Sequence, residues 1–217
     1  MGLAVGRLSL TAWRGQGGVA APAPGGGRDA YLSAAAPDRM VAGAYSFGNW
    51  SVSARTAWSR RPAPGRFQEQ KGSTLSAADV AYRGGPWAAR VSVGALIEPF
   101  GPLGSNVATT GPLAMPARTG FVTISAEAPL ADGVSAFGEV SGGQTRIDGP
   151  LFSMERGYSS AWRVGVTGEC RRLRVACSRL TFEISQPLRM ESGVFLARLA
   201  DRPEHYFDDL TFSWREA

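Results

Sequence analysis

The sequence predicts an all-β fold, made of antiparallel strands that run up and down in chain order. Three observations support this class. Apolar and polar residues alternate over many segments, Gly-containing turns separate these segments, and 28 Gly and 14 Pro in 217 residues suit many connections between strands. No run shows apolar residues at the three-four spacing of a helix, and no stretch of roughly 18 apolar residues is present.

Six segments follow the same rule of alternation. From Trp87 to Glu98, the odd positions carry Trp, Ala, Val and Ile, while Arg90, Ser92 and Glu98 fall on even positions. A helix would distribute such residues around its circumference. The other five predicted strands cover residues 50–59, 122–128, 134–141, 162–169 and 180–185. Residues 3–13 also read as one strand, and the Gly/Pro-rich residues 14–28 as a loop within one domain.

The predicted connections alternate in length. Three are short turns, namely Gly48-Asn49, Gly84-Gly85-Pro86 and Ala131-Asp132-Gly133, and three are long, namely residues 61–73, 99–117 and 145–158. Short turns at one end and long loops at the other are typical of outer-membrane barrels.

Aromatic residues gather near the ends of the predicted strands. They are expected to form two girdles at the membrane interfaces, one beside the short turns and one at the opposite strand ends. The first set is Tyr45, Phe47, Trp50, Tyr82 and Trp87, and the second is Trp58, Tyr158 and Trp162.

Charged residues occupy the face of each strand opposite the apolar one. In a membrane barrel they would line the lumen, whereas in a soluble sandwich they would face water, and the period alone does not choose between the two. The predicted lumen-facing charges are Arg55, Asp79, Arg90, Glu127, Glu139, Arg163, Glu169 and Glu183. Loop asymmetry and aromatic placement favour an antiparallel up-and-down outer-membrane β-barrel of about ten to twelve strands. The alternative is a soluble all-β ligand-binding module, either a sandwich or a lipocalin-like barrel.

One segment near the C-terminus carries a family resemblance. Residues 179–193, RLTFEISQPLRMESG, follow a pattern of a strand and then Ser-Gln-Pro-Leu-Arg-Val-Glu-Ser-Gly, with Met190 in place of Val. Together with VSAFGEVSGGQTR at 134–146 and Ser-Ser-Ala-Trp at 159–162, this order is similar to the autotransporter-like C-terminal β-barrel domains of alphaproteobacterial subtilisin-like serine proteases. The likeness covers about residues 118–193.

The resemblance implies a bacterial outer-membrane barrel that anchors a protease passenger and helps to export it. Its implied partners are outer-membrane lipid, the barrel-assembly machinery and the passenger, encoded upstream in the same precursor. Members of the family usually continue through further strands to a terminal aromatic residue, whereas this chain ends Trp214-Arg215-Glu216-Ala217. No secretory leader follows Met1. We therefore expect one barrel domain from a longer chain, incomplete at its C-terminus.

The sequence predicts no enzymatic chemistry in this chain. Its single histidine, His205, lies near Asp201, Glu204, Asp208 and Asp209, but no Gly-flanked nucleophile accompanies them. We assign no catalytic, cofactor-binding or metal-binding residue, and expect the protease activity to reside upstream. The net charge of +5 comes from arginines spread singly through the strands, which argues against nucleic-acid binding.

Two cysteines lie close together in the sequence. A hairpin centred between Cys170 and Cys177 would bring them opposite each other, within reach of a disulfide. Such a bond suits an oxidising periplasm, but a reduced pair of small apolar residues is equally compatible with the spacing.

Overall fold

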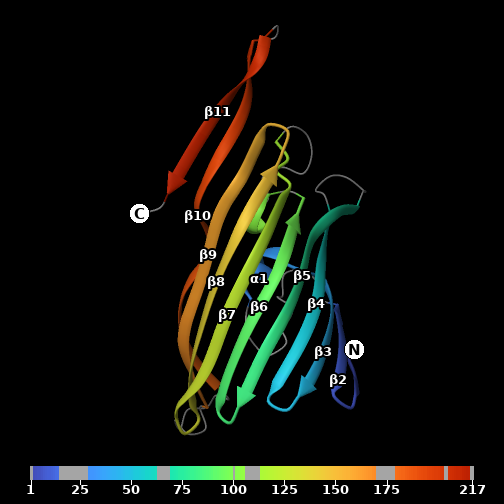
Figure 1. Cartoon of the computed structure of the whole chain (residues 1–217), viewed down its shortest axis with the longest axis vertical. Helices are drawn as coiled ribbons and strands as arrows, with labels where there is room; N and C mark the ends of the chain where they lie inside the picture. The colour runs from blue at the N-terminus through green and yellow to red at the C-terminus, as the bar shows by residue number, and fades with distance from the viewer. Residues whose placement is uncertain are drawn as a thin grey trace.

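The computed structural model describes residues 2–14, 29–62, 69–99, 101–105, 113–169, 179–202 and 205–215. Within them, eleven strands form one antiparallel sheet in chain order, accompanied by one short helix and one 3-10 turn (Figure 1). The strands are β1 (Gly2–Val5), β2 (Leu8–Arg14), β3 (Arg39–Phe47), β4 (Trp50–Pro62), β5 (Glu69–Gly84), β6 (Trp87–Glu98), β7 (Ala117–Ala131), β8 (Val134–Asp148), β9 (Phe152–Glu169), β10 (Arg179–Arg202) and β11 (His205–Arg215).

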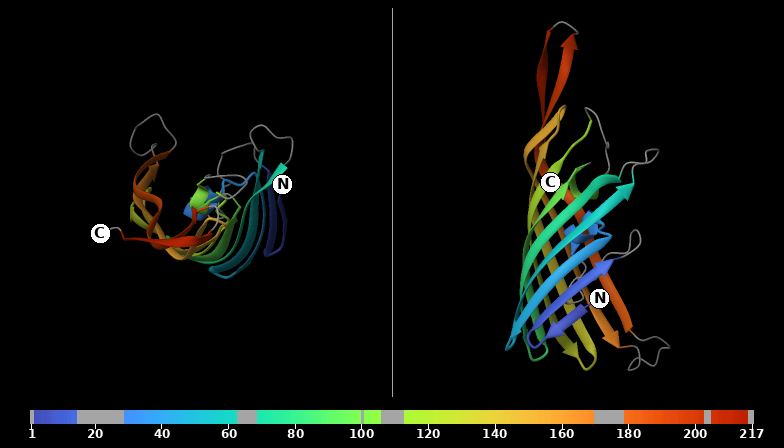
Figure 2. Two further views of the ribbon diagram at one scale, coloured as in Figure 1. Left: turned by 90° about the horizontal axis from the view of Figure 1, so that it is seen from above. Right: turned by 90° about the vertical axis from the view of Figure 1, so that its right-hand side faces the viewer.

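The predicted fold class is confirmed: the protein is all-β, antiparallel and up-and-down, with a strand number inside the expected range. The sheet curves into an open trough, as Figure 2 shows from above. Among the described residues, β1 pairs only with β2 and β11 only with β10, so the sheet is not closed and is consistent with an incomplete barrel. No helix in the described segments is long and apolar enough to cross a membrane.

All three predicted short turns are present at one end of the sheet. A fourth turn at the same end corrects the prediction of one strand over residues 3–13, which form the hairpin of β1 and β2. Each of the four turns contains a glycine with positive φ, a conformation that L side chains rarely adopt: Gly6, Gly48, Gly85 and Gly133. Because the alternation continues through both strands, Gly6 is the only residue in the sequence that indicates this turn.

The long connections are shorter than the sequence indicated, except for one. The prediction of a long loop at 145–158 is wrong, because β8 and β9 extend through it and only Gly149, Pro150 and Leu151 join them. Gly149 and Pro150 suggested a longer loop, but they lie in this short connection, and the pairing of β8 and β9 shifts register after Thr145. Between β4 and β5, only residues 63–68 separate the strands. The connection from β6 to β7 is long, as predicted, and contains the 3-10 turn η1 (Pro102–Gly104).

The sequence did not predict the helix α1 (Ala30–Ala35), which lies inside the trough in Figure 2. Asp29 caps its N-terminus, because its Oδ1 accepts hydrogen bonds from the backbone N–H groups of Tyr31 (3.0 Å) and Leu32 (3.3 Å). Six residues make a marginal helix in water, so packing against the sheet must stabilise it. The largest buried apolar cluster lies where α1 meets β3–β7, and comprises Tyr31, Leu32, Ala35, Met40, Ala57, Leu75, Ala77, Leu96 and Phe121.

Candidate functional site

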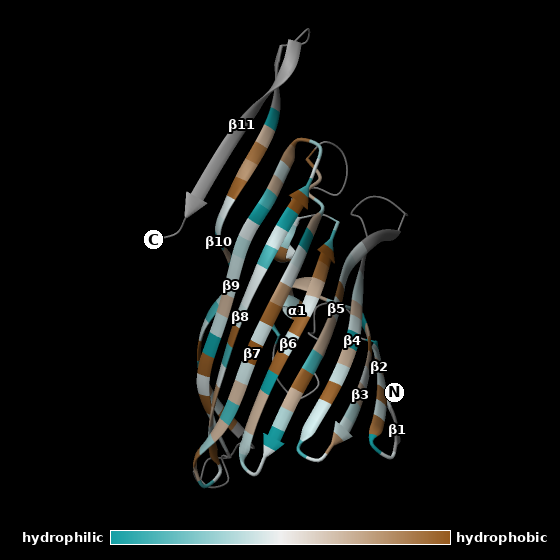
Figure 3. Ribbon diagram, in the orientation of Figure 1, coloured by the Kyte–Doolittle hydropathy of each residue, from teal (hydrophilic) through white to brown (hydrophobic). Residues whose placement is uncertain are grey.

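The convex face of the sheet is apolar and exposed. Strand by strand, brown apolar bands alternate with paler ones in Figure 3, and strand pairing aligns the apolar residues into rows. One row crosses six neighbouring strands from β4 to β9, and each of its side chains is at least 39% exposed: Val52, Val80, Val91, Ile124, Val140 and Trp162. A contiguous apolar surface of this extent marks a face that contacts lipid or another protein.

The aromatic residues beside the short turns form a cluster on this convex face. Tyr45, Phe47, Trp50, Tyr82 and Trp87 are all exposed. The rings of Trp50 and Tyr82 lie 4.9 Å apart, and those of Tyr45 and Phe47 lie 6.2 Å apart. These positions agree with an interfacial girdle at the turn end.

The second predicted girdle is only partly at a strand end. Trp58 lies towards the far end of β4 and is half-buried, whereas Tyr158 is exposed within β9. Tyr158 and Trp162 both lie inside β9, away from its two ends, so their predicted placement at a strand end is wrong. Strand β9 is longer than the alternating segment that was recognised in the sequence, because it begins at Phe152.

The concave face holds a buried ion network beneath α1. Arg55 donates to both oxygens of Asp79, at 3.2 Å each, and pairs on its other side with Asp29, the N-cap of the helix. Arg90 lies 3.4 Å from Asp79, which also accepts hydrogen bonds from Ser53 and Ser92. Three of the predicted lumen charges therefore meet at one point and join the helix to β4, β5 and β6.

A second group of predicted charges lies on β8–β10. Arg163 is 3.0 Å from Glu139 and 3.7 Å from Glu183, and its guanidinium lies 5.6 Å from the centre of the Phe137 ring. Glu127 is exposed on β7 and belongs to neither group. Glu169 ends β9, and its side chain lies outside the described ones.

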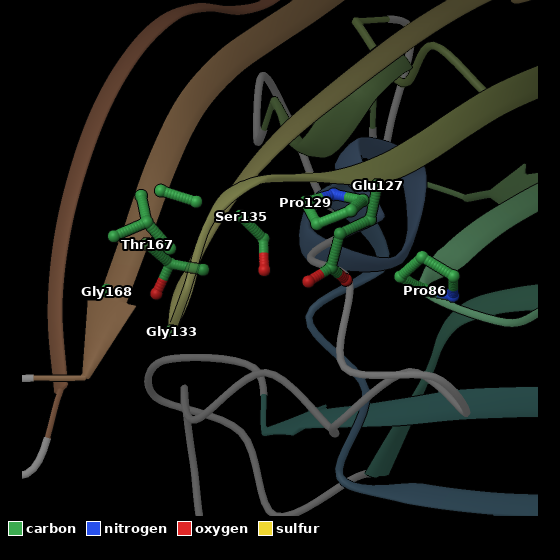
Figure 4. Close-up of a pocket in the computed structure, with 9 residues that line it drawn as sticks. Pro86, Glu127, Pro129, Gly133, Ser135, Thr167 and Gly168 are labelled. Carbon is green, nitrogen blue, oxygen red and sulfur yellow. The ribbon is translucent and has the colours of Figure 1, made fainter.

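Glu127 contributes instead to a shallow pocket of about 230 Å³ near the short turns of the sheet (Figure 4). Pro86, Pro129, Ser135 and Thr167 are among its other lining residues. The lining side chains combine the carboxylate of Glu127 with the hydroxyls of Ser135 and Thr167. Among the described residues, no group of three or more His, Cys, Asp or Glu side chains could hold a metal ion.

Two side-chain contacts of Tyr31 hold α1 against the sheet. The Tyr31 ring stacks on Phe121 with centroids 4.3 Å apart, and its hydroxyl lies 2.9 Å from the Ser159 hydroxyl on β9. Burial raises the pKa of the Tyr31 phenol above its ordinary value. Gly143 leaves the space this needs, because a Cβ there would lie 2.4 Å from the Tyr31 hydroxyl.

The connection from β6 to β7 is fixed to the sheet beside α1. Glu98, the last residue of β6, accepts hydrogen bonds from the backbone N–H groups of Leu103 (2.7 Å) and Gly104 (2.6 Å) in η1. The helix and η1 together fill part of the trough (Figure 2). Sequence reasoning missed Asp29, Tyr31, Glu98 and Ser159. The only available signal was an Asp directly before the short apolar run AYL, which is typical of an N-cap.

The motif near the C-terminus forms a hydrogen-bonded cluster on the convex face. Gln186, Arg189 and Glu191 of β10 join Ser160 and Trp162 of β9 through bonds that include Trp162 Nε1 to Gln186 at 2.8 Å and Arg189 to Glu191 at 3.1 Å. The pairing of β9 and β10 shifts between Gln186 and Arg189, around Pro187. These residues interrupt the apolar surface on β10.

The structure does not describe the side chains of two groups of residues named in the sequence analysis. Cys170 and Cys177 lie outside the described residues. His205 begins β11 opposite Arg202, and its side chain and those of Asp201, Asp208 and Asp209 are not among those described.

Comparison with known proteins adds no relative: no family model, no curated protein and no solved structure matches this chain.

Proposed function

We propose that this chain is an outer-membrane β-barrel domain that anchors a protein in the bacterial outer membrane and has no catalytic activity of its own. The observation that carries the proposal is the inverted distribution of polarity on the sheet. Large apolar side chains are exposed on the convex face, while Arg55, Asp79 and Glu139 are buried on the concave one. A barrel in lipid requires this arrangement, with an apolar exterior and a polar interior.

The strand lengths support the same proposal. A strand that crosses a membrane at a tilt needs about 9–11 residues. The seven strands from β4 to β10 have 12 to 24 residues each, so every one of them is long enough. Aromatic residues beside the short turns would then lie at the periplasmic interface, and the long connections would face outward.

The anchored protein is proposed from the sequence resemblance alone. The motif at 179–193 resembles autotransporter-type subtilases, so we propose a subtilisin-like passenger and a translocator role in its export. The buried ion network and α1 contribute to this role only by filling part of the interior.

The soluble alternative has no comparable support. A sandwich or lipocalin-like barrel would bury the alternating apolar residues inside and expose the charges. In the described strands, Val91, Ile124 and Val140 are about half exposed instead, while Asp79 is 4% exposed.

Migration on a semi-native gel, with and without boiling, tests the membrane proposal. The purified chain is refolded in plain buffer, in detergent micelles and in phosphatidylcholine vesicles. We expect a compact band that shifts on boiling only where detergent or lipid is present. A monodisperse, folded chain in plain buffer would contradict the proposal and favour the soluble module.

A further inference from the structure

Exposed arginines gather at one end of the convex face, where the longer connections join the strands. On three adjacent strands, Arg118 lies next to the start of β7, Arg146 near the end of β8 and Arg156 near the start of β9. Arg14 at the end of β2 and Arg198 on β10 are exposed as well. Towards the short turns, the outward positions of β7, β8 and β9 carry no charged residue.

Strand pairing brings these arginines together. Arg118 lies directly opposite Arg146, and Arg146 faces the bulge of β9 that contains Glu155 and Arg156. Like charges directly opposite each other on neighbouring strands destabilise a sheet, so this arrangement favours an anionic ligand that neutralises them.

The carboxylates nearby neutralise this cluster only in part. Asp148 pairs with Arg146 at 3.0 Å, with both side chains more than half exposed, and Glu155 is the other exposed acid on these strands. The side chains of Arg118 and Arg156 form no hydrogen bond or ion pair with the part of the chain that the structure describes.

We propose that Arg118, Arg146 and Arg156 form a binding site for the phosphate groups of lipid headgroups in the outer leaflet. This inference rests on the proposed function, because it requires the apolar face below the arginines to lie in lipid. Guanidinium groups bind phosphate oxygens through paired N–H donors, and the cluster lies where an apolar surface meets the polar end of the strands. Arginines near an anionic membrane surface strengthen binding to that surface.

Lipid A carrying phosphates is the probe, and lipid A without them is its control. Wild-type protein, the double variant Arg118→Gln/Arg146→Gln and the variant Arg83→Gln are folded into phosphatidylcholine vesicles containing either form. Arg83 is exposed next to a short turn at the opposite end, so its replacement removes one positive charge away from the cluster. Native mass spectrometry of detergent extracts then counts retained lipid A for each folded chain.

We expect the wild type and Arg83→Gln to retain phosphorylated lipid A about tenfold more than the double variant does. Equal retention by the double variant, or equal retention of the phosphate-free lipid, would overturn the inference. Folding in phosphatidylcholine alone, followed by a heat-shifted band, tests the membrane proposal separately. A chain that fails there overturns both, whereas a chain that folds there but shows no phosphate preference overturns only the headgroup site.

Discussion

The two faces of one sheet differ in what covers their side chains. On the concave face, α1 and η1 bury polar and charged groups, so that Arg55 is 2% exposed and Ser92 is fully buried. On the convex face nothing in the described chain covers Val91 or Ile124. Since burying charge is costly and exposing apolar surface to water is unfavourable, water is a poor solvent for this arrangement and lipid is a good one.

The two faces also differ in how their polar side chains are paired. On the concave side, Asp29, Arg55 and Asp79 compensate one another away from water. The cluster around Gln186 and Glu191 lies on the convex side and is partly exposed. Removing one member should therefore cost much more in the first group than in the second.

The largest effect is expected from breaking the buried ion network. Arg55→Met leaves Asp29 and Asp79 without their shared cation, and should lower the free energy of unfolding by roughly 3–5 kcal/mol. Urea titration of the refolded protein in vesicles measures it. Arg83→Met removes an exposed arginine and serves as the control, and an equal loss in both variants would show that the network is not special.

A charge introduced on the convex face should lower the free energy of unfolding slightly less than Arg55→Met does. Val91→Arg places a cation within the apolar row and should destabilise the membrane-inserted protein by about 2–4 kcal/mol. The matched variant is Thr181→Arg, at an exposed position on the opposite face of β10 and directly opposite Thr167, with an expected change within about 0.5 kcal/mol. Comparable losses at the two positions in vesicles would contradict the assignment of the faces.

The packing of Tyr31 against the sheet should be disturbed by one methyl group added at position 143. In Gly143→Ala, the new Cβ would lie 2.4 Å from the Tyr31 hydroxyl and 3.0 Å from the carbonyl oxygen of Gly120, so about 1–3 kcal/mol should be lost. Gly120→Ala, with no atom within 4 Å of its Cβ, is the control and should be neutral. If Gly143→Ala is as stable as the control by urea titration, the packing of α1 is looser than described.

The smallest expected effect is a change in the free energy of unfolding at alkaline pH. Burial holds the pKa of Tyr31 above its ordinary value of 10.0, so the folded protein keeps the phenol protonated where the unfolded chain ionises it. The stability contributed by this group is present below pH 10 and should decrease as pH rises above it. Unfolding curves of wild type and Tyr31→Phe between pH 9 and 11 measure the difference. Parallel curves would contradict a buried phenol.

Much of the sheet could be predicted from the sequence, because an alternating period and a Gly turn are local signals. The pattern from Trp87 to Glu98 matches β6 residue for residue. The hairpin within residues 3–13 was missed because its two-residue turn, Gly6-Arg7, interrupts a continuous alternating run. The three-residue junction of β8 and β9 was placed inside a longer loop, because the start of β9 was not recognised. The girdle at Trp162 was misplaced for the same reason, because the start of β9 was not recognised.

The interior was much less predictable. The sequence pattern selected Arg55, Asp79 and Arg90 for one face, but not their meeting point, which depends on strand register and on Asp29. Helix α1 is too short to show a period. It forms because its apolar residues pack on Leu75, Leu96 and Phe121, which lie far away in the chain.

The central claim is that the convex face contacts lipid, and spin labels along β10 test it most directly. With Cys170 and Cys177 replaced by Ser, single cysteines are introduced at residues 180–185, where every native side chain is exposed on one face or the other. In vesicles, we predict that labels at 180, 182 and 184 are accessible to oxygen dissolved in lipid, and those at 181, 183 and 185 to a water-soluble nickel complex. Uniform access of the nickel complex to all six positions would contradict the account.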